Sequence, residues 1–325
     1  MKKIIALVLV LSLSLLCFVA CGNKDKGNND DNNTPTEKNY TLAIGVATTQ
    51  DGAEVANTVA ALILDSDNKI VACRIDTLAI KATLTDGIVD ANTYKTKAEL
   101  GKDYGMLTNS PYYGSSLAEW DDQAKAFETY VVGKTQAEVN GIALNEDGKP
   151  TNADLTAGCT IAVTDFIKAV DNAFKSVRKV AFKSSETLTL GVSAVGTVAN
   201  VKDKDENPTP VASYTADYAA TVIAGGKVIA AIIDSNEVTA DIANNEIGTI
   251  TNPGTKLEQG DSYGMVAYGN AVAEWYAQAQ AYANTAVGKT ASEVAGLSTD
   301  KIEGSCTMYV GGYKVALEKA ASYTR

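Results

Sequence analysis

Two Cys-Thr pairs carry the side chains of the sequence that are best placed for a covalent attachment. Each threonine hydroxyl is preceded by small residues, in the runs Ala157-Gly158-Cys159-Thr160 and Gly304-Ser305-Cys306-Thr307. A hydroxyl among small neighbours is a group that a transferase can reach and esterify. A helix is predicted after each pair, at 165–174 and 312–321. Its first N–H groups would favour a phosphate attached there.

A second set of matching residues precedes each pair. Lys97 and Lys256 are cations that could bind a phosphate, and a Tyr-Gly-Met run follows each of them. Tyr104 and Tyr263 could stack on a flat ring with a methionine beside them, Met106 or Met265. Plainer interpretations stay open. The lysines could be solvated, the Tyr-Gly-Met runs could be shared turns, the cysteines could be small buried residues, and the threonines could be strand residues.

The chain has no histidine, which excludes several kinds of chemistry. Neither a Ser-His-Asp triad nor a Cys-His pair can form, and His-ligated zinc or haem iron is also excluded. No metal site is therefore predicted. With Cys17 and Cys21 set aside, Cys73, Cys159 and Cys306 remain. Three scattered cysteines outside any Cys-x-x-Cys motif indicate no disulfide framework and no redox pair.

The first 21 residues have the layout of an export signal. Lys2 and Lys3 precede the apolar run 4–16, and Ala20 comes directly before Cys21. The run is shorter than the roughly 20 apolar residues that a membrane-spanning helix needs. The junction resembles the lipobox of bacterial lipoproteins, although Phe18 stands where leucine is usual. This resemblance implies cleavage after residue 20, acylation of Cys21, and anchoring to the outer face of the cytoplasmic membrane, at the cell surface.

The segment that follows predicts a flexible tether. Residues 21–38 are rich in Asn, Asp, Gly and Lys and have no apolar cluster that could form a core. The whole chain carries a formal charge of −11, and without Lys2 and Lys3 the charge is −13, from 26 basic and 39 acidic residues. Such an acidic protein is a poor partner for nucleic acid.

The mature chain is predicted to be an internal duplication. The two halves share the same short runs in the same order, which places repeat 1 at 39–184 and repeat 2 at 185–325. The matched runs are 41–46 with 187–192, 69–76 with 227–234, 96–97 with 255–256, 104–106 with 263–265, 118–120 with 273–275, 132–135 with 287–290, and 159–160 with 306–307. Gln123 likewise matches Gln278. We expect each repeat to fold around its own core.

Each repeat reads as an α+β domain of one small sheet plus helices. Strands are predicted over 40–47, 55–64 and 69–76, with turns at Asp67-Asn68 and Gly225-Gly226. An apolar stripe at helical spacing follows in each repeat, and it puts both tryptophans in the core. The stripes are Leu117, Trp120, Ala124, Phe127 and Val131, and Val272, Trp275, Ala279 and Tyr282. Ser116 with Glu119, Thr135 with Glu138 and Thr290 with Glu293 are predicted capping boxes.

The repeats resemble the FMN-binding domain of exported flavoproteins and of sodium-pumping quinone reductases. The resemblance rests on the strand pair at Lys69-Ile70 and Lys227-Val228 and on the Cys-Thr runs. In that family the run is Asp-x-x-Ser-Gly-Ala-Thr, and a flavin transferase esterifies FMN to the threonine. The resemblance therefore implies FMN at Thr160 and Thr307. Thr160 is the closer match, because Asp154 keeps the family spacing.

Two functions from different classes follow. The first is a surface electron carrier in which flavin passes electrons from a membrane donor to an outside acceptor. The second is a non-catalytic ligand- or partner-binding lipoprotein on the same fold without flavin, which the altered Ser-Gly-Ala-Thr run favours. A hydrolase is not supported, because no nucleophile–base pair is visible.

Overall fold

The structure is a computed structural model that describes residues 36–85, 88–89, 94–107 and 116–324. The predicted signal peptide, the lipidated Cys21 and the tether up to residue 35 lie outside these residues. Thr36–Arg325 forms one compact unit. Its first strand starts at Lys38, the last residue assigned to the tether.

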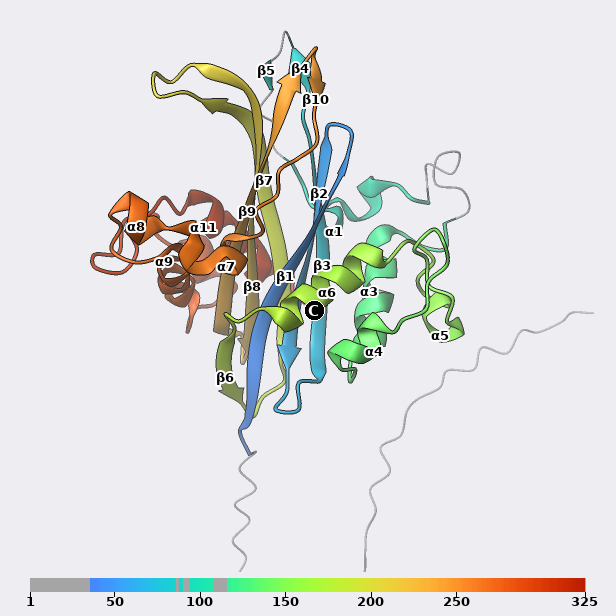
Figure 1. The fold of residues 1–325 in the computed structure, drawn as a ribbon. Coiled ribbons are helices and arrows are strands. Elements are labelled where there is room, and N and C mark those ends of the chain that lie inside the picture. The colour runs from blue at the N-terminus through green and yellow to red at the C-terminus, as the bar shows by residue number, and fades with distance from the viewer. Residues whose placement is uncertain (1–35, 86–87, 90–93, 108–115, 325) are drawn as a thin grey trace, which may run out of the picture. The chain divides into compact units, whose positions relative to one another are not determined.

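The chain is a mixed α+β protein with two antiparallel sheets of four strands each (Figure 1). The first sheet has the order β3-β2-β1-β6 and contains β1 (Lys38–Asp51), β2 (Glu54–Leu64), β3 (Ile70–Lys81) and β6 (Val180–Ser184). The second has the order β10-β9-β8-β7 and contains β7 (Thr189–Lys202), β8 (Pro208–Ala224), β9 (Lys227–Ala243) and β10 (Glu246–Ile247). Leu84–Thr85 (β4) and Ile88–Val89 (β5) form a separate small pair.

The three predicted strands of repeat 1 are confirmed, and all three are longer than the sequence pattern indicated. The predicted turns between the second and third strands are also confirmed. Asn68 has φ 56°, and Gly225 and Gly226 have φ 54° and 76°. These positive values suit Asn and Gly, which reach the left-handed region at little cost.

The helices of each repeat follow its long strands in the same order. Repeat 1 has α1 (Lys97–Leu100), η1 (Gly101–Tyr104), α3 (Trp120–Val131), α4 (Gln136–Asn140), α5 (Ala153–Thr156) and α6 (Thr164–Lys175). Repeat 2 has α7 (Lys256–Gln259), η2 (Gly260–Tyr263), α8 (Met265–Gly269), α9 (Trp275–Ala283), η3 (Asn284–Ala286), α10 (Ala291–Ala295) and α11 (Gly311–Ser322).

Two of the three predicted capping boxes are confirmed, at Thr135 with Glu138 and at Thr290 with Glu293. The prediction for Ser116 with Glu119 is wrong. Glu119 is itself the residue before α3, and its carboxylate accepts from a distant loop instead. Leu117 and Val272 also lie before the helices and are exposed, so they do not belong to the apolar stripes. Trp120 and Trp275 are buried as predicted.

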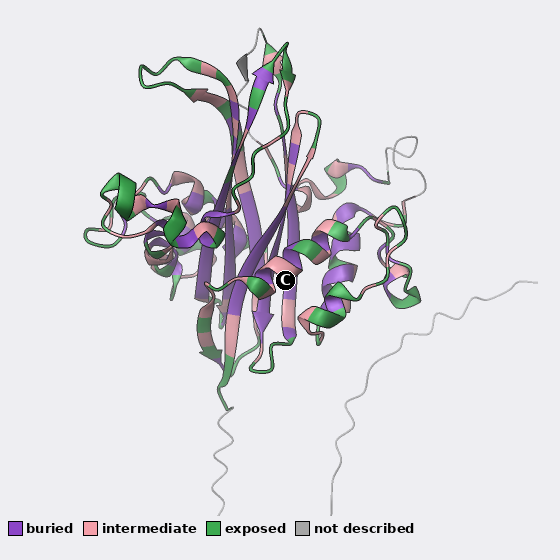
Figure 2. Ribbon diagram, in the orientation of Figure 1, coloured by how far each residue is buried: buried purple, intermediate pink, exposed green. Residues whose placement is uncertain are grey.

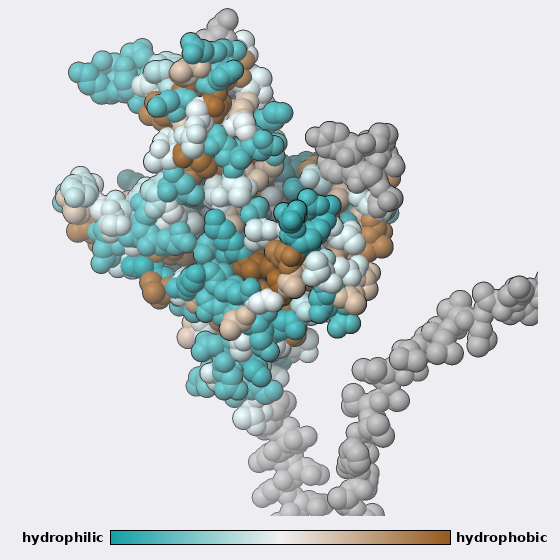
Figure 3. Space-filling model, turned by 45° about the vertical axis from the view of Figure 1, so that its right-hand side comes forward, coloured by the Kyte–Doolittle hydropathy of each residue, from teal (hydrophilic) through white to brown (hydrophobic). Residues whose placement is uncertain are grey.

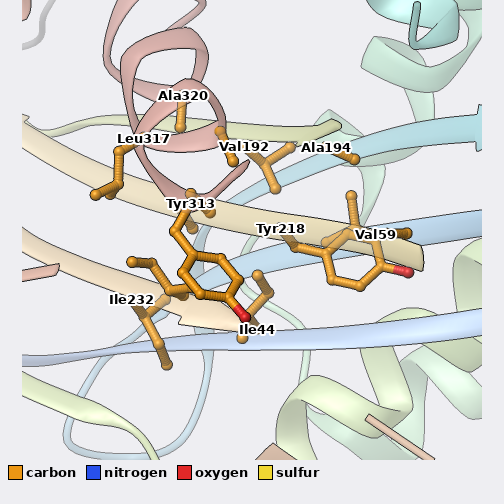
Figure 4. Close-up of a cluster of buried hydrophobic side chains, with 14 of the residues drawn as sticks. Ile44, Val59, Val192, Ala194, Tyr218, Ile232, Tyr313, Leu317 and Ala320 are labelled. Atoms are coloured by element: carbon orange, nitrogen blue, oxygen red, sulfur yellow. The ribbon is translucent and has the colours of Figure 1, made fainter. Parts of the chain in front are cut away.

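The two sheets share a core, which differs from the expectation of two separate cores. Alternate residues of β1 face opposite ways: Leu42 and Ile44 belong to a cluster that includes β7–β9 and α11, while Ala43 and Ala47 pack with the helices of repeat 1. Figure 4 shows Ile44 and Val59 of the first sheet close to Tyr218 of the second. The middle of β1 and most of β2 are therefore buried on both faces (Figure 2), which explains the nearly continuous apolar runs in these two strands.

The last helix of each repeat crosses its first strand at a glycine. A Cβ on Gly45 would overlap the backbone of Ala169 and Ala173 in α6, and a Cβ on Gly191 would overlap the backbone of Ala320 in α11. Polar contacts also join the repeats. Asn236 donates to the Thr48 hydroxyl at 2.9 Å, and the Tyr214 hydroxyl donates to the Ala53 carbonyl at 2.9 Å.

Candidate functional site

A buried aspartate in the middle of a strand, β3 or β9, positions the lysine helix in each repeat. Asp76 Oδ1 accepts from the Ala98 N–H at 3.1 Å, and Asp234 Oδ1 accepts from the Leu257 N–H at 3.0 Å. Burial raises the pKa of Asp76 to about 6 and that of Asp234 to about 7, against opposing hydrogen bonds from Thr96 and Thr255. Each aspartate therefore fixes the position of the short helix that carries the lysine, α1 or α7, relative to the sheet.

Each lysine lies over the aromatic rings of its own repeat. Lys97 Nζ is 5.1 Å from the centre of the Tyr104 ring and 5.6 Å from that of Trp120. Lys256 Nζ is 5.1 Å from Tyr263 and 5.8 Å from Trp275. All four distances are in the range of a cation–π contact. The interpretation of the lysines as solvated side chains is wrong for Lys256, which is buried.

A glutamate holds the turn of each Tyr-Gly-Met run with both carboxylate oxygens. Glu119 accepts from the N–H groups of Met106 at 2.9 Å and Leu107 at 3.2 Å. Glu274 makes the same pair of bonds to Met265 at 2.9 Å and to the next residue at 3.2 Å. The glutamates therefore fix the loop that carries the tyrosine and methionine. They are more than the simple helix-end charges that their positions indicate.

A glutamine holds the threonine of each Cys-Thr pair. Gln123 Oε1 accepts from the N–H and the hydroxyl of Thr160 at 2.9 and 3.1 Å. Gln278 Oε1 does the same for Thr307 at 2.9 and 3.4 Å. Both threonines lie outside the strands, so the interpretation of them as strand residues is wrong. Thr160 is exposed and Thr307 is partly exposed.

The neighbouring cysteines are structural. Cys159 and Cys306 are both buried in the cores of their repeats. Burial raises the pKa of Cys159 to about 11 and also raises that of Cys306. Neither is a reactive thiolate at neutral pH. The small residues before them differ. Gly158 is partly buried and has no room for a Cβ, which would overlap the side chain of Ala126, whereas Ser305 is exposed.

A hollow of about 730 Å³ brings the predicted residues of repeat 2 together. Lys256, Tyr263 and Met265 line it, with Trp275, Tyr309 and Tyr313. Thr307 does not line it, but the two residues that follow, Met308 and Tyr309, do. Repeat 1 contributes Tyr94 to the wall, and Lys319 of the wall pairs with Glu99 of repeat 1 at 2.6 Å.

A carboxylate that had no counterpart in the sequence comparison also lines this hollow. Asp217 of β8 accepts from the Ser235 hydroxyl through Oδ1 at 2.8 Å. Its Oδ2 lies at the start of α11, where a Cβ on Gly312 would overlap it. Burial raises the pKa of Asp217 to about 6, and Lys256 nearby lowers it again in part. The hollow therefore combines aromatic walls, one carboxylate and two lysines, of which Lys319 is paired with Glu99.

Repeat 1 has different residues at the matching positions. The strand pairing puts Thr58 where repeat 2 has Asp217, and Thr58 shares a hydrogen bond of 3.0 Å with Thr77. Counting from the Cys-Thr pairs puts Asp165 at the position of Gly312 and Phe166 at that of Tyr313. The two aromatic rings are true equivalents, because each meets its tryptophan edge-on at 5.7 and 5.8 Å. The acidic residue thus stands on the helix in repeat 1 and on the strand in repeat 2.

The residues that sequence reasoning missed fall into two groups. The first group consists of residues that match between the repeats, although the match did not show which backbone and hydroxyl groups they hold: Glu119, Glu274, Gln123 and Gln278. Asp217 gave no signal, since repeat 1 has threonine there.

Comparison with known proteins gives no relative: no family model, no curated protein and no solved structure matches the chain. Among the described residues, no helix is long and apolar enough to cross a membrane. The same part of the chain has no cluster of three or more acidic, cysteine or histidine side chains arranged to hold a metal ion.

Proposed function

We propose that the chain is an exported, lipid-anchored carrier protein that holds a flavin in the hollow of repeat 2. The observation that carries this proposal is the hollow itself. Three of the flavin contacts predicted from the sequence, Lys256, Tyr263 and Met265, line one cavity, together with Met308, the residue after Thr307.

The size and walls of the hollow suit a flat ring. Its volume of about 730 Å³ lies within the roughly 300–1,000 Å³ that is usual for small-molecule sites. Tyrosine and tryptophan side chains and two methionines surround it, and such groups bind planar ligands by stacking. Tyr309 is 87 % exposed, so its ring can move over a ligand without leaving a core.

Lys256 supplies a cation inside the hollow that can donate to an oxygen of the ring. The rim of the hollow suits the other end of FMN. Thr307 lies four residues before α11, which begins at Gly311, and its hydroxyl is partly exposed. An FMN esterified there would be attached at the rim of the hollow.

A flavin bound there would supply one- or two-electron transfer, and the protein would position it. Lys256 and Asp217 would set the charge around the ring, and the aromatic walls would exclude water from it. Acylation of Cys21 would keep the domain at the membrane surface, near a membrane donor. These roles describe an electron carrier more than a turnover enzyme.

One observation favours a second candidate, a ligand-binding lipoprotein without flavin. The hydroxyls of Thr160 and Thr307 each already donate to a glutamine oxygen, and an acidic residue faces the hollow. A carboxylate disfavours a phosphate placed close to it. In this alternative the hollow takes a planar molecule that carries no phosphate.

Mass spectrometry of the mature protein tests the covalent form of the proposal. The protein should be produced in a host that also contains a flavin transferase. We expect a mass gain of one FMN unit that is lost in Thr307→Ala, with fluorescence of the denatured band lost in parallel. Thr160→Ala is the matched variant in repeat 1 and should leave the attachment at Thr307 intact.

Titration with FMN tests the non-covalent form. We expect Lys256→Gln to weaken binding at least about tenfold, because the cation is buried beside the rings, and Lys97→Gln to leave binding unchanged. An unmodified mass in a host shown to flavinylate another protein, together with no FMN binding, would contradict the flavin proposal and leave the second candidate.

A further inference from the structure

The hollow of repeat 2 has an acceptor whose second oxygen is open to a ligand. Asp217 Oδ1 accepts from Ser235, and among the described residues Oδ2 has no hydrogen-bond donor. Asp217 lines the hollow between the strands and the start of α11. A carboxylate oxygen in such a place is a strong hydrogen-bond acceptor, and leaving it without a donor is energetically costly.

The groups that face Asp217 limit what this donor can be. Lys256 and Glu237 act on its charge, and the Tyr313 hydroxyl approaches Ser235 and Trp275 from α11. On the far wall Lys319 is paired with Glu99. A cationic ligand would meet Lys256, and an anionic ligand would meet Asp217. A neutral ring that offers one donor and one acceptor suits both.

The carboxylate is not needed to build this fold. In repeat 1 Thr58 stands at the same place, and its hydroxyl pairs with that of Thr77 with no charge present. Gly312 is required only because Asp217 is there, since any Cβ would overlap Oδ2. Repeat 2 therefore has two linked changes whose shared effect is to direct a carboxylate into the hollow.

We propose that Asp217 accepts a hydrogen bond from a ring N–H of the ligand, so that repeat 2 selects neutral heteroaromatic rings with an N–H beside a carbonyl group. Lys256 donates to the carbonyl and the aromatic side chains enclose the ring faces. This inference rests on the proposed function, and it adds the orientation: in a flavin, the imide edge enters the hollow and the dimethylbenzene edge faces outward.

A pair of ligands that differ by one methyl group tests this orientation. Lumiflavin has the imide N–H and no phosphate, and 3-methyllumiflavin has the same ring with that N–H replaced. Binding of each to the mature protein is measured by the change in flavin fluorescence. We expect the methylated ring to bind about tenfold to a hundredfold more weakly, since a hydrogen bond to a charged acceptor is lost.

The matched variant is Asp217→Thr, which installs the residue of repeat 1. Its hydroxyl can pair with Ser235 as Thr58 pairs with Thr77, so we expect it to fold. In this variant the two ligands should bind with equal affinity.

Equal binding of the two ligands to the wild-type protein would overturn the inference and leave the proposed function standing. Discrimination that persists in Asp217→Thr would overturn it as well, because another group would then read the N–H. Failure of both rings and of FMN to bind would overturn the proposed function and the inference together.

Discussion

The two repeats are built on one frame and differ where the hollow lies. In both, an aspartate holds the lysine helix, a glutamate holds the Tyr-Gly-Met turn and a glutamine holds the threonine. Around the hollow, repeat 2 exchanges Thr58, Asp165 and Phe166 for Asp217, Gly312 and Tyr313. The shared residues maintain geometry, and the exchanged ones determine what the geometry can bind. We propose that duplication has produced a structural copy beside a copy that is equipped for a ligand.

The shared frame is most sensitive where the last helix crosses the first strand. Gly45→Ala and Gly191→Ala should each lower the free energy of unfolding by at least about 3 kcal/mol, because the new Cβ meets helix backbone that cannot turn aside. Urea unfolding followed by circular dichroism measures this. A loss of stability in only one of the two variants would show that the helix–strand crossing is not built in the same way in both repeats.

The linked pair in repeat 2 gives the next largest effect. Gly312→Ala should weaken lumiflavin binding about a hundredfold and lower stability, because Asp217 must leave its position. In an Asp217→Thr background the same change should cost little stability, so a double-mutant cycle should show coupling above about 1 kcal/mol. Asp165→Ala, at the matching site of repeat 1, should leave ligand binding unchanged. Additive effects of the two changes would remove the link that we infer.

The glutamates that hold the turns test whether only one turn serves a ligand. Glu274→Gln replaces one of two carboxylate acceptors and should weaken lumiflavin binding about tenfold, since Met265 and its neighbours lose their fixed position. Glu119→Gln should cause a similar small loss of stability and no change in binding. Equal loss of binding in both variants would place a second ligand in repeat 1.

The smallest effect is a pH dependence of stability at Asp217. Burial raises the pKa of this carboxyl to about 6, above its unfolded value near 4. The folded state therefore holds an extra proton between these values, and stability falls as pH rises from about 4 through 6. Asp217→Thr removes this loss. Its stability relative to wild type should increase from pH 5 to pH 8, as measured by urea unfolding, and a difference that is constant with pH would contradict the assignment.

Sequence patterns predicted the strands and helices better than they predicted which of these elements pack against one another. Periodicity and turn residues located the strands, the helix after the Cys-Thr pairs and the confirmed capping boxes, because these depend on neighbours in the chain. The shared core could not be predicted in the same way. The alternation of Leu42 and Ile44 against Ala43 shows that β1 has two buried faces, but not that β7–β9 covers one of them.

The residues of the candidate site also fall into two groups, those that the sequence predicted and one that it did not. Residues repeated in both halves, such as Lys256 and Tyr263, were found because duplication marked them, and they do meet in one hollow. Asp217 was missed because its importance comes from what lies across from it, Ser235 on the next strand and Gly312 at a helix start. A residue that is special to one repeat is invisible to a comparison of repeats.

The central claim is that repeat 2 is the copy that binds a flavin, and a crystal structure of the mature protein with FMN tests it most directly. The account predicts flavin density in the hollow between Tyr263, Trp275 and Tyr309, with the imide edge at Asp217 and Lys256. Flavin density at Lys97 and Tyr104 in repeat 1, with the hollow of repeat 2 free of flavin, would contradict it.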